Sequence, residues 1–251
     1  MGASTLPTDG DYTASTSADD MKAIADFLNI NETYVFSHDK GAGIAAAFAI
    51  KYPDLVKRVG LSEYGLPGFG YEQFWSPSPD WTLYSNWQLA FFSVPKAAEF
   101  FISGKEKEML AWYFWHASYQ GDEAIPESHL ERYATQLRKP GFLESMLQVF
   151  STKTVAADAE FFTEALTSQP LQQPALGMGG EASFGSISLI QQLFNPVATN
   201  LQSVLISKAG HWILDENPEE VAKIVLEFFA QDEGITTVDL SYLAGKVTLT
   251  Q

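Results

Sequence analysis

The chain has 251 residues, of which 46% are hydrophobic and 18% are charged, a composition typical of a folded protein of one or two domains. Its formal net charge is −16 and its basic residues form no cluster, so binding to nucleic acid or to an anionic membrane surface is not expected. The chain has no cysteine, which excludes disulfides and thiol catalysis and fits a reducing compartment. No apolar run in the sequence is long enough to cross a bilayer.

The first part of the chain alternates helices and strands after a polar stretch over residues 1–16. The predicted elements are a helix capped by Ser17, a strand over 34–36, a helix that ends near Tyr52 before Pro53, and a strand over 56–61. The first helix is predicted from apolar residues at helical spacing, Met21, Ile24, Ala25 and Leu28. A strand, a helix and a second strand in succession predict a parallel sheet with buried strands.

Residues 67–168 differ in pattern, being aromatic-rich and helical without strand-like alternation. Helices are expected around Trp87–Phe92, Ala97–Phe101 and Met109–Ser118. The α/β pattern then returns, with strands over 174–179 and 203–207, a helix over 186–194, and a last helix from Asn217-Pro218 to about Gln231. A helical insertion within an α/β frame is typical of a cap over a site. We therefore expect a first core part (1–66), a cap (67–168), a second core part (169–231) and an unassigned polar tail (232–251).

The run from Ser37 to Gly41 reads Ser-His-Asp-Lys-Gly and joins the first strand directly to an Ala/Gly-rich helix. This pattern is typical of a nucleophile elbow, a tight turn whose central side chain projects above the edge of the sheet. Small residues are expected on both sides of the centre because larger side chains would collide. The central residue is Asp39, and a carboxylate nucleophile indicates an alkyl-ester intermediate. The alternative is a short buried strand followed by the start of a Gly-rich helix.

Two further polar residues follow predicted strands. Glu63 comes after the second strand, and His211 lies between the last strand and the last helix, flanked by Gly210 and Trp212. Taken singly, each has a simpler explanation, a solvated carboxylate and a loop histidine. Because the carboxyl ends of parallel strands meet at one edge of a sheet, Asp39, Glu63 and His211 are expected to come together. In such a triad His211 activates water and Glu63 fixes the tautomer of the imidazole.

These motifs resemble those of the epoxide hydrolase and haloacid dehalogenase branch of the α/β-hydrolase superfamily. The elbow is similar to the branch's G-H-D-x-G, with Ser37 replacing the first Gly, and residues 210–219 resemble its G-H-W-x-x-x-E-x-P-E motif around the catalytic histidine. Part of the branch carries its third acid 24 residues after the nucleophile, which here is Glu63. Residues 179–185 also resemble a family segment, G-G-E-K-S-F-G, and leave Glu181 as an alternative third acid. The resemblance implies an α/β-hydrolase fold with a parallel sheet and a helical cap.

The chain departs from this branch at its amino end. Residues 1–7 resemble a G-x-G-x-S-x-x-P stretch that follows the fourth strand in the family. The sequence contains no H-G-x-P segment, which supplies one oxyanion donor in the family. We therefore expect a truncated form lacking the N-terminal strands, with the elbow strand on an exposed sheet edge. The amide of Lys40 is then the remaining oxyanion donor.

The predicted cap departs as well. The resemblance implies two cap residues, Tyr or Tyr with His, that donate to an epoxide oxygen near Trp87-Gln88 and near Phe150, but neither place holds such a residue. The halide-binding His-Trp pair of the dehalogenases is missing near Gln88, and Lys40 stands where those enzymes prefer Arg, which disfavours a small haloacid. Candidate substitutes are Tyr84, Tyr113, Tyr119, Tyr133 and His116. The expected substrate-binding residues are His38, Trp87, Gln88, Phe150 and Trp212.

We therefore expect a cofactor-independent hydrolase that acts on an apolar epoxide or a related small electrophile. Three alternatives stay open: a catalytically impaired or inactive truncated relative, a dehalogenase-like hydrolase, and Asp39 acting as a general base in decarboxylation or cyclisation. The four histidines are widely separated, so no metal site is expected. A small apolar molecule is the expected partner, the cytoplasm is the expected location, and a homodimer is left open.

Overall fold

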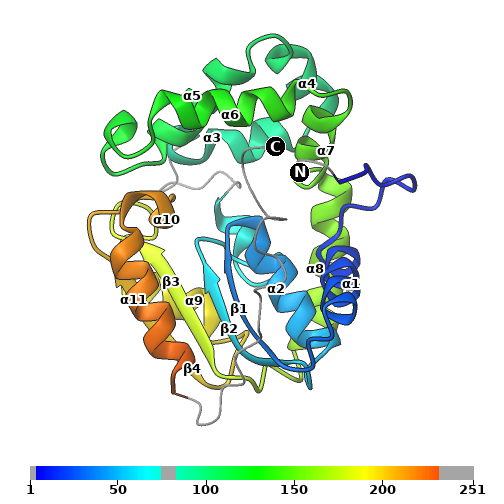
Figure 1. The fold of residues 1–251 in the computed structure, drawn as a ribbon, viewed down its shortest axis with the longest axis vertical. Coiled ribbons are helices and arrows are strands. Elements are labelled where there is room, and N and C mark those ends of the chain that lie inside the picture. Colours follow the sequence, from blue (N-terminus) through cyan, green and yellow to red (C-terminus); the bar gives the residue numbers. More distant parts are fainter. Residues whose placement is uncertain (1–3, 75–82, 232–251) are drawn as a thin grey trace.

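The computed structural model of the protein describes residues 4–74 and 83–231. Within these residues four parallel strands form one sheet in the order β1-β2-β3-β4 (Figure 1). The strands are β1 (Thr33–His38), β2 (Val56–Ser62), β3 (Ala175–Gly180) and β4 (Leu201–Ile206). Strands β2 and β3 are neighbours although a long helical segment separates them in the sequence, so the predicted parallel sheet is confirmed.

Helices cover both faces of the sheet, which is the arrangement that buries parallel strands. The helices that pack with the sheet are α1 (Ala14–Phe27), α2 (Lys40–Lys51), α8 (Thr152–Leu166), α9 (Ile187–Phe194), the short α10 (Ile213–Glu216) and α11 (Pro218–Phe229). One buried cluster joins α1, α2, α8 and α9 to one face, and a second joins α10 and α11 to the other. Every residue of β3 is buried, whereas every residue of the edge strand β1 is only partly buried.

Helix α1 differs from the sequence expectation in its cap and in its buried face. Its N-cap is Thr13, whose side chain accepts from the amide of Thr16, and not Ser17. Met21 and Ile24 are 41% and 51% exposed, and the buried residues of the helix are alanines. The physical reason is that α1 packs on α2, whose buried face is also mostly alanine, and two such faces approach too closely to enclose long side chains.

Most of the helices between β2 and β3 form a layer over the carboxyl ends of the strands (Figure 1). They are α3 (Leu83–Phe92), α4 (Pro95–Ile102), α5 (Glu106–His116), α6 (Glu127–Leu137) and α7 (Phe142–Gln148), with 3-10 turns at Tyr71–Phe74 and Gly121–Glu123. These five helices share a buried aromatic and aliphatic cluster of their own. We call this layer the cap. Helix α8 lies inside the predicted cap segment 67–168 but packs on α1 and the sheet core.

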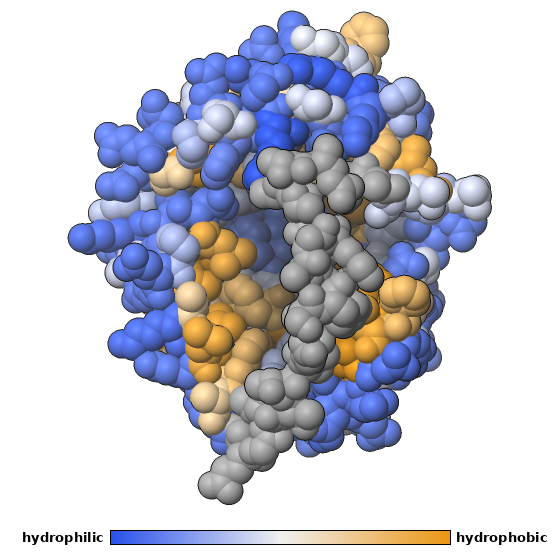
Figure 2. All heavy atoms as spheres, in the orientation of Figure 1, coloured by the Kyte–Doolittle hydropathy of each residue, from blue (hydrophilic) through white to orange (hydrophobic). Residues whose placement is uncertain are grey.

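The surface has hydrophilic and hydrophobic regions. On the face drawn in Figure 2 the periphery is hydrophilic, and hydrophobic residues gather over the lower half. No helix in the described ranges is long and apolar enough to cross a membrane. The tail 232–251, the first three residues of the chain and the side chain of Tyr84, all considered in the sequence, lie outside the described residues.

Candidate active site

Asp39 occupies the turn between β1 and α2, with φ 50° and ψ −134°. A positive φ is costly for a residue with a side chain, and such strain is typical of a nucleophile elbow. The amide of Asp39 donates to the carbonyl of Ser62 (3.0 Å), which holds the turn against β2. A Cβ on Gly41 would meet only the Cβ of Ser37, at an ordinary 4.0 Å, so the turn has room for an alanine at this position.

Glu63 follows β2 and also has a positive φ, 55°. Its side chain is 1% exposed, and one carboxylate oxygen, Oε1, accepts from the amide of Gly180 (2.6 Å) and the hydroxyl of Ser183 (2.5 Å). The other oxygen lies 2.9 Å from Nδ1 of His211. The alternative acid, Glu181, accepts from the amide of Lys208 instead. Geometry therefore favours Glu63 as the partner of the imidazole.

His211 follows β4 and reaches both carboxylates. Its Nε2 lies 3.3 Å from Oδ2 of Asp39, while its Nδ1 faces Glu63. The backbone of His211 is fixed as well, since its amide donates to the carbonyl of Ala117 in the cap (2.7 Å) and its carbonyl lies 2.6 Å from Nε2 of His38. The three residues that the sequence predicted to meet are thus in hydrogen-bond contact at one edge of the sheet.

The charges in this cluster shift one another. Burial alone would raise the pKa of Asp39, but the hydrogen bond and the charge of His211 outweigh burial and hold that pKa below its usual value. Burial alone would lower the pKa of His211, yet Asp39 and Glu63 together raise it above its usual value. In the resting site the imidazole of His211 is therefore in its charged form, protonated on both nitrogens, between the carboxylates of Asp39 and Glu63.

Tyr113, on α5 of the cap, completes the contacts of Asp39. Its hydroxyl donates to Oδ2 of Asp39 (3.2 Å). Burial and the nearby carboxylate raise the pKa of Tyr113 well above its usual value, so the phenol stays protonated. From the sequence, Tyr113 is only one of five candidate replacements for the two cap residues that donate to an epoxide oxygen, because no motif surrounds it. The packing of α5 over the sheet is what brings Tyr113 to Asp39.

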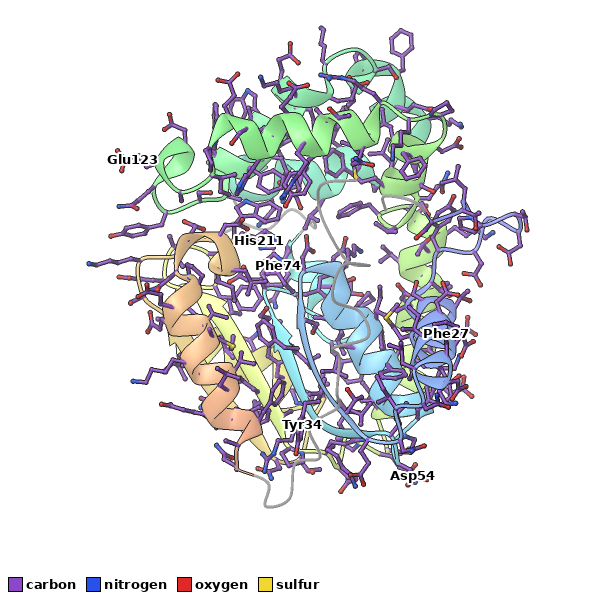
Figure 3. The ribbon with its side chains drawn as sticks, viewed as in Figure 1. Phe27, Tyr34, Asp54, Phe74, Glu123 and His211 are labelled. Carbon is purple, nitrogen blue, oxygen red and sulfur yellow. The ribbon has the colours of Figure 1, made fainter. Side chains whose placement is uncertain are left out.

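A cavity of about 330 Å³ opens beside Asp39, between the sheet edge and the cap. Its lining mixes polar and aromatic side chains from both layers, among them Asp39, Glu63, Tyr64, Tyr71, Phe74, Gln88, Leu89, Tyr113, His116, Phe184 and His211. In Figure 3 the labelled side chains of His211 and Phe74 lie between the sheet and the cap helices above it. A concave site of this size at the carboxyl ends of parallel strands suits a small molecule.

The five residues expected to bind substrate divide in the structure. Gln88 lines the cavity, whereas its neighbour Trp87 lines a separate groove between cap helices. The indole of Trp212 stacks on Phe114 (4.0 Å between centroids) and is turned into the cap. Phe150 packs edge-on against Phe92 within the cap cluster. Of the five, only Gln88 is among the residues that line the cavity.

His38 and Lys40 flank Asp39 without lining the cavity. The ring of His38 is held by the carbonyl of His211, and burial lowers its pKa. The amide of Lys40 begins α2, where helical amides have no carbonyl partner within the helix, so it is available to an oxyanion. The ammonium of Lys40 donates to Tyr64 (3.0 Å), and burial lowers the pKa of this lysine to about 8.

Across residues 4–74 and 83–231, no group of three or more His, Asp or Glu is arranged to hold a metal ion. One small cavity is lined by a carboxylate, an imidazole and a phenol, and the amide of Lys40 adjoins that carboxylate in the chain. These groups can form and hydrolyse an ester at Asp39.

The sequence is similar to those of proteins named epoxide hydrolases. Epoxide hydrolase 3 of Mus musculus is 26% identical over 221 residues, which are 86% of this chain and 57% of that protein. Epoxide hydrolase 4 of Homo sapiens is 24% identical over 217 residues, 85% of this chain and 58% of that protein. The soluble epoxide hydrolase of Corynebacterium sp. (strain C12) is 26% identical, over 92% of this chain and 78% of that protein. The chain thus spans a little more than half the length of the mouse and human relatives.

Solved structures are similar as well. Cfl2 from Burkholderia cenocepacia superposes with a TM-score of 0.83 at 27% identity, covering 91% of this chain and 76% of that one. The epoxide hydrolase CorEH superposes with a TM-score of 0.77 at 23% identity, covering 92% and 79%, and shares the fold. The family described as alpha/beta hydrolase fold matches residues 1–218. The sheet of parallel strands covered by helices and the elbow at the end of β1 agree with this match. The chain therefore belongs to the alpha/beta hydrolase fold family.

Proposed function

We propose that this protein is a hydrolase that opens the epoxide ring of a small apolar molecule through a covalent ester on Asp39. The contact of His211 with both Asp39 and Glu63 carries the proposal, because a carboxylate nucleophile needs a base to release its ester. The relatives named epoxide hydrolases support it, at 22 to 26% identity. Glu63 is proposed to hold the imidazole, and the amide of Lys40 to stabilise the oxyanion.

The first step is the opening of the ring. Asp39 attacks one epoxide carbon, the bond from that carbon to the ring oxygen breaks, and Tyr113 gives its proton to the departing oxygen. The products are a hydroxyalkyl ester on Asp39 and a tyrosinate. Esterification removes the negative charge 3.2 Å from the phenol, so the main electrostatic obstacle to ionising Tyr113 disappears during the same step.

A proton then moves from His211 to Tyr113, since both groups face the same oxygen of Asp39. The loss of the Asp39 charge drives this transfer, because that charge raises the pKa of His211 in the resting site. The imidazole is now neutral and can accept a proton, and Glu63 remains to stabilise the imidazolium that forms. The nucleophile thus controls when its own base becomes active.

The second step is hydrolysis of the ester. His211 takes a proton from water, the hydroxide adds to the ester carbonyl, and the amide of Lys40 donates to the oxyanion. Collapse of the tetrahedral intermediate releases the diol, whose leaving oxygen takes the proton from His211. Asp39 is left protonated and returns its proton to His211, which restores the resting ion pair. Water is the only co-reactant, and every proton is accounted for.

Single turnover in heavy-oxygen water tests this proposal. With the enzyme in excess over styrene oxide, one water oxygen enters the carboxylate of Asp39, and mass spectrometry of the peptide that contains it shows a gain of one label. The matched control is Asp158→Asn, which alters a buried carboxylate that accepts from the amide of Ala14 but keeps Asp39. If no label enters Asp39 and Asp39→Ala is as active as the parent, the covalent route is wrong, and an inactive relative or different chemistry takes its place.

A further inference from the structure

The loop that carries His211 is joined to the cap through its backbone. The amide of His211 donates to the carbonyl of Ala117 (2.7 Å), and the amide of Tyr119 donates to the carboxylate of Glu216. The approach is close, because a Cβ on Gly210 would lie 2.4 Å from the oxygen of Ala117 and 2.9 Å from the nitrogen of Tyr119. The end of α5 and the catalytic loop therefore meet backbone to backbone.

The carboxylate of Glu216, in α10, holds both sides of this junction. Its Oε1 accepts from the amides of Gly210 (2.9 Å) and Trp212 (3.2 Å), the two residues that flank His211. Its Oε2 accepts from Tyr119 in the cap. Hydrogen bonds to an ionised acceptor are stronger than those between neutral groups. The side chain of Glu216 thus links the residues on both sides of His211 to each other and links this loop to the cap.

We propose that Glu216 is a positioning residue that sets the place of the imidazole of His211 and so governs hydrolysis of the ester more than its formation. This inference rests on the proposed function. Formation of the ester uses Asp39 and Tyr113, which are placed by the elbow and by α5. Hydrolysis requires Nε2 of His211 to reach a water molecule at the ester, and the peptide groups around His211 are those that Glu216 binds.

Glu216→Gln is the informative change, because the amide keeps one acceptor oxygen and replaces the other by a donor. An NH₂ group cannot accept from a backbone amide, so either the bonds to the loop or the bond to Tyr119 must be lost. The matched control is Glu219→Gln, which removes the same charge from an exposed position in the first turn of α11. Glu216→Asp keeps both oxygens on a shorter stem and is expected to lie between the parent and Glu216→Gln.

The kinetic test follows the covalent adduct during a single turnover of styrene oxide, with rapid quenching and mass spectrometry. In Glu216→Gln we expect the adduct to form within about threefold of the parent rate and to decay about ten- to a hundredfold more slowly, since a displacement of about 1 Å can cost that much. Glu219→Gln is expected to match the parent in both steps. Equal slowing of both steps by Glu216→Gln, or slowing of neither, would overturn the proposal.

A second measurement does not depend on activity. Hydrogen exchange of peptides that cover residues 117–119 and 210–212 is expected to be faster in Glu216→Gln at both places and unchanged in Glu219→Gln. If the parent forms no adduct, the proposed function fails, and exchange still decides whether Glu216 holds the loop. Unchanged exchange at 210–212 in Glu216→Gln would reject the positioning role even if the parent protein is active. If Glu216→Gln does not fold, the adduct kinetics and the hydrogen exchange are measured on Glu216→Asp instead.

Discussion

The hydroxyl of Tyr113 donates to Oδ2 of Asp39, the same oxygen that faces Nε2 of His211. Among the described residues Oδ1 of Asp39 has no hydrogen-bond partner, and its side chain is 23% exposed toward the cavity. The carboxylate is thus oriented through one oxygen while the other is free to attack an electrophile.

Tyr113→Phe is expected to slow formation of the covalent adduct by about a hundredfold or more, in the range usual for loss of a general acid. The packing of the ring on Phe92 and Trp212 is kept, so stability should change little. The measurement is the rate of adduct formation with styrene oxide under single-turnover conditions. Tyr133→Phe, which alters a ring stacked on Phe114 inside the cap, is the control and should leave the rate unchanged. Equal rates in the two variants would mean that Tyr113 donates no proton.

His211→Gln is expected to trap the ester. Attack by Asp39 needs no base, whereas removal of the ester does, so the adduct should form and persist. Intact-protein mass spectrometry after mixing with styrene oxide would show a mass increase of one substrate in this variant and only a transient one in the parent. An adduct that decays at the parent rate would exclude His211 as the base.

Glu63→Gln and Glu181→Gln separate the two candidate acids. Glu63 contacts the imidazole at 2.9 Å, and Glu181 binds the amide of Lys208 instead. We expect Glu63→Gln to slow decay of the adduct by about a hundredfold or more, because the wrong tautomer of His211 becomes accessible. Glu181→Gln should stay within about threefold of the parent. If Glu181→Gln slowed decay of the adduct strongly and Glu63→Gln did not, Glu181 would be the acid that orients His211.

Asp158→Asn should stabilise the protein at neutral pH. Asp158 is 5% exposed and accepts from the amide of Ala14, and burial raises its pKa from 3.8 to about 6. A carboxyl with a raised folded-state pKa contributes stability below pH 3.8 that is lost as the pH rises through about 6. Above pH 6 the variant should therefore gain about 2–3 kcal/mol over the parent, at about 1.4 kcal/mol for each pKa unit.

Urea unfolding of both proteins between about pH 3 and 8 would measure this difference. The amide of Asn can still accept from Ala14, so the gain should shrink as the pH falls and vanish below pH 3.8, where Asp158 is protonated in both the folded and the unfolded chain. A difference that does not change with pH would show that the charge of Asp158 is not its cause.

Gly41→Ala and Gly180→Ala should differ sharply in stability. A Cβ at Gly41 meets only Ser37, and alanine favours helix α2 by up to about 1 kcal/mol. A Cβ at Gly180 would lie 2.1 Å from the carbonyl oxygen of Gly210, a backbone atom that cannot turn away. Thermal unfolding is expected to show Gly41→Ala as neutral or stabilising and Gly180→Ala as destabilised by about 2 kcal/mol or more. Similar losses in both variants would refute the steric argument.

The strands and the polar triad could be read from the sequence because both depend on local order along the chain. A short apolar run fixes a strand, and the parallel arrangement then brings Asp39, Glu63 and His211 to one edge. Helix faces were harder to predict: Met21 and Ile24 have helical spacing but are exposed, because the contact with α2 admits only small residues.

The cap residues could not be assigned because their roles depend on how each helix is rotated over the cavity. Trp87 and Gln88 are adjacent in sequence, yet Gln88 lines the cavity beside Asp39 and Trp87 lines a different groove. Tyr113 reaches Asp39 across 74 positions of sequence, a contact that no periodicity or motif encodes.

The pairing of β2 with β3 places a demand on folding. The whole cap lies within the loop that this pairing closes, and this loop is more than a hundred residues long. Closing it therefore has an entropic cost, and the pairing of residues so far apart in sequence gives the sheet a high contact order. On the ribosome Asp39 and Glu63 emerge long before β4 and His211. Until those arrive the two carboxylates have no imidazole between them, so the reactive centre is completed only after β4 and His211 have been made.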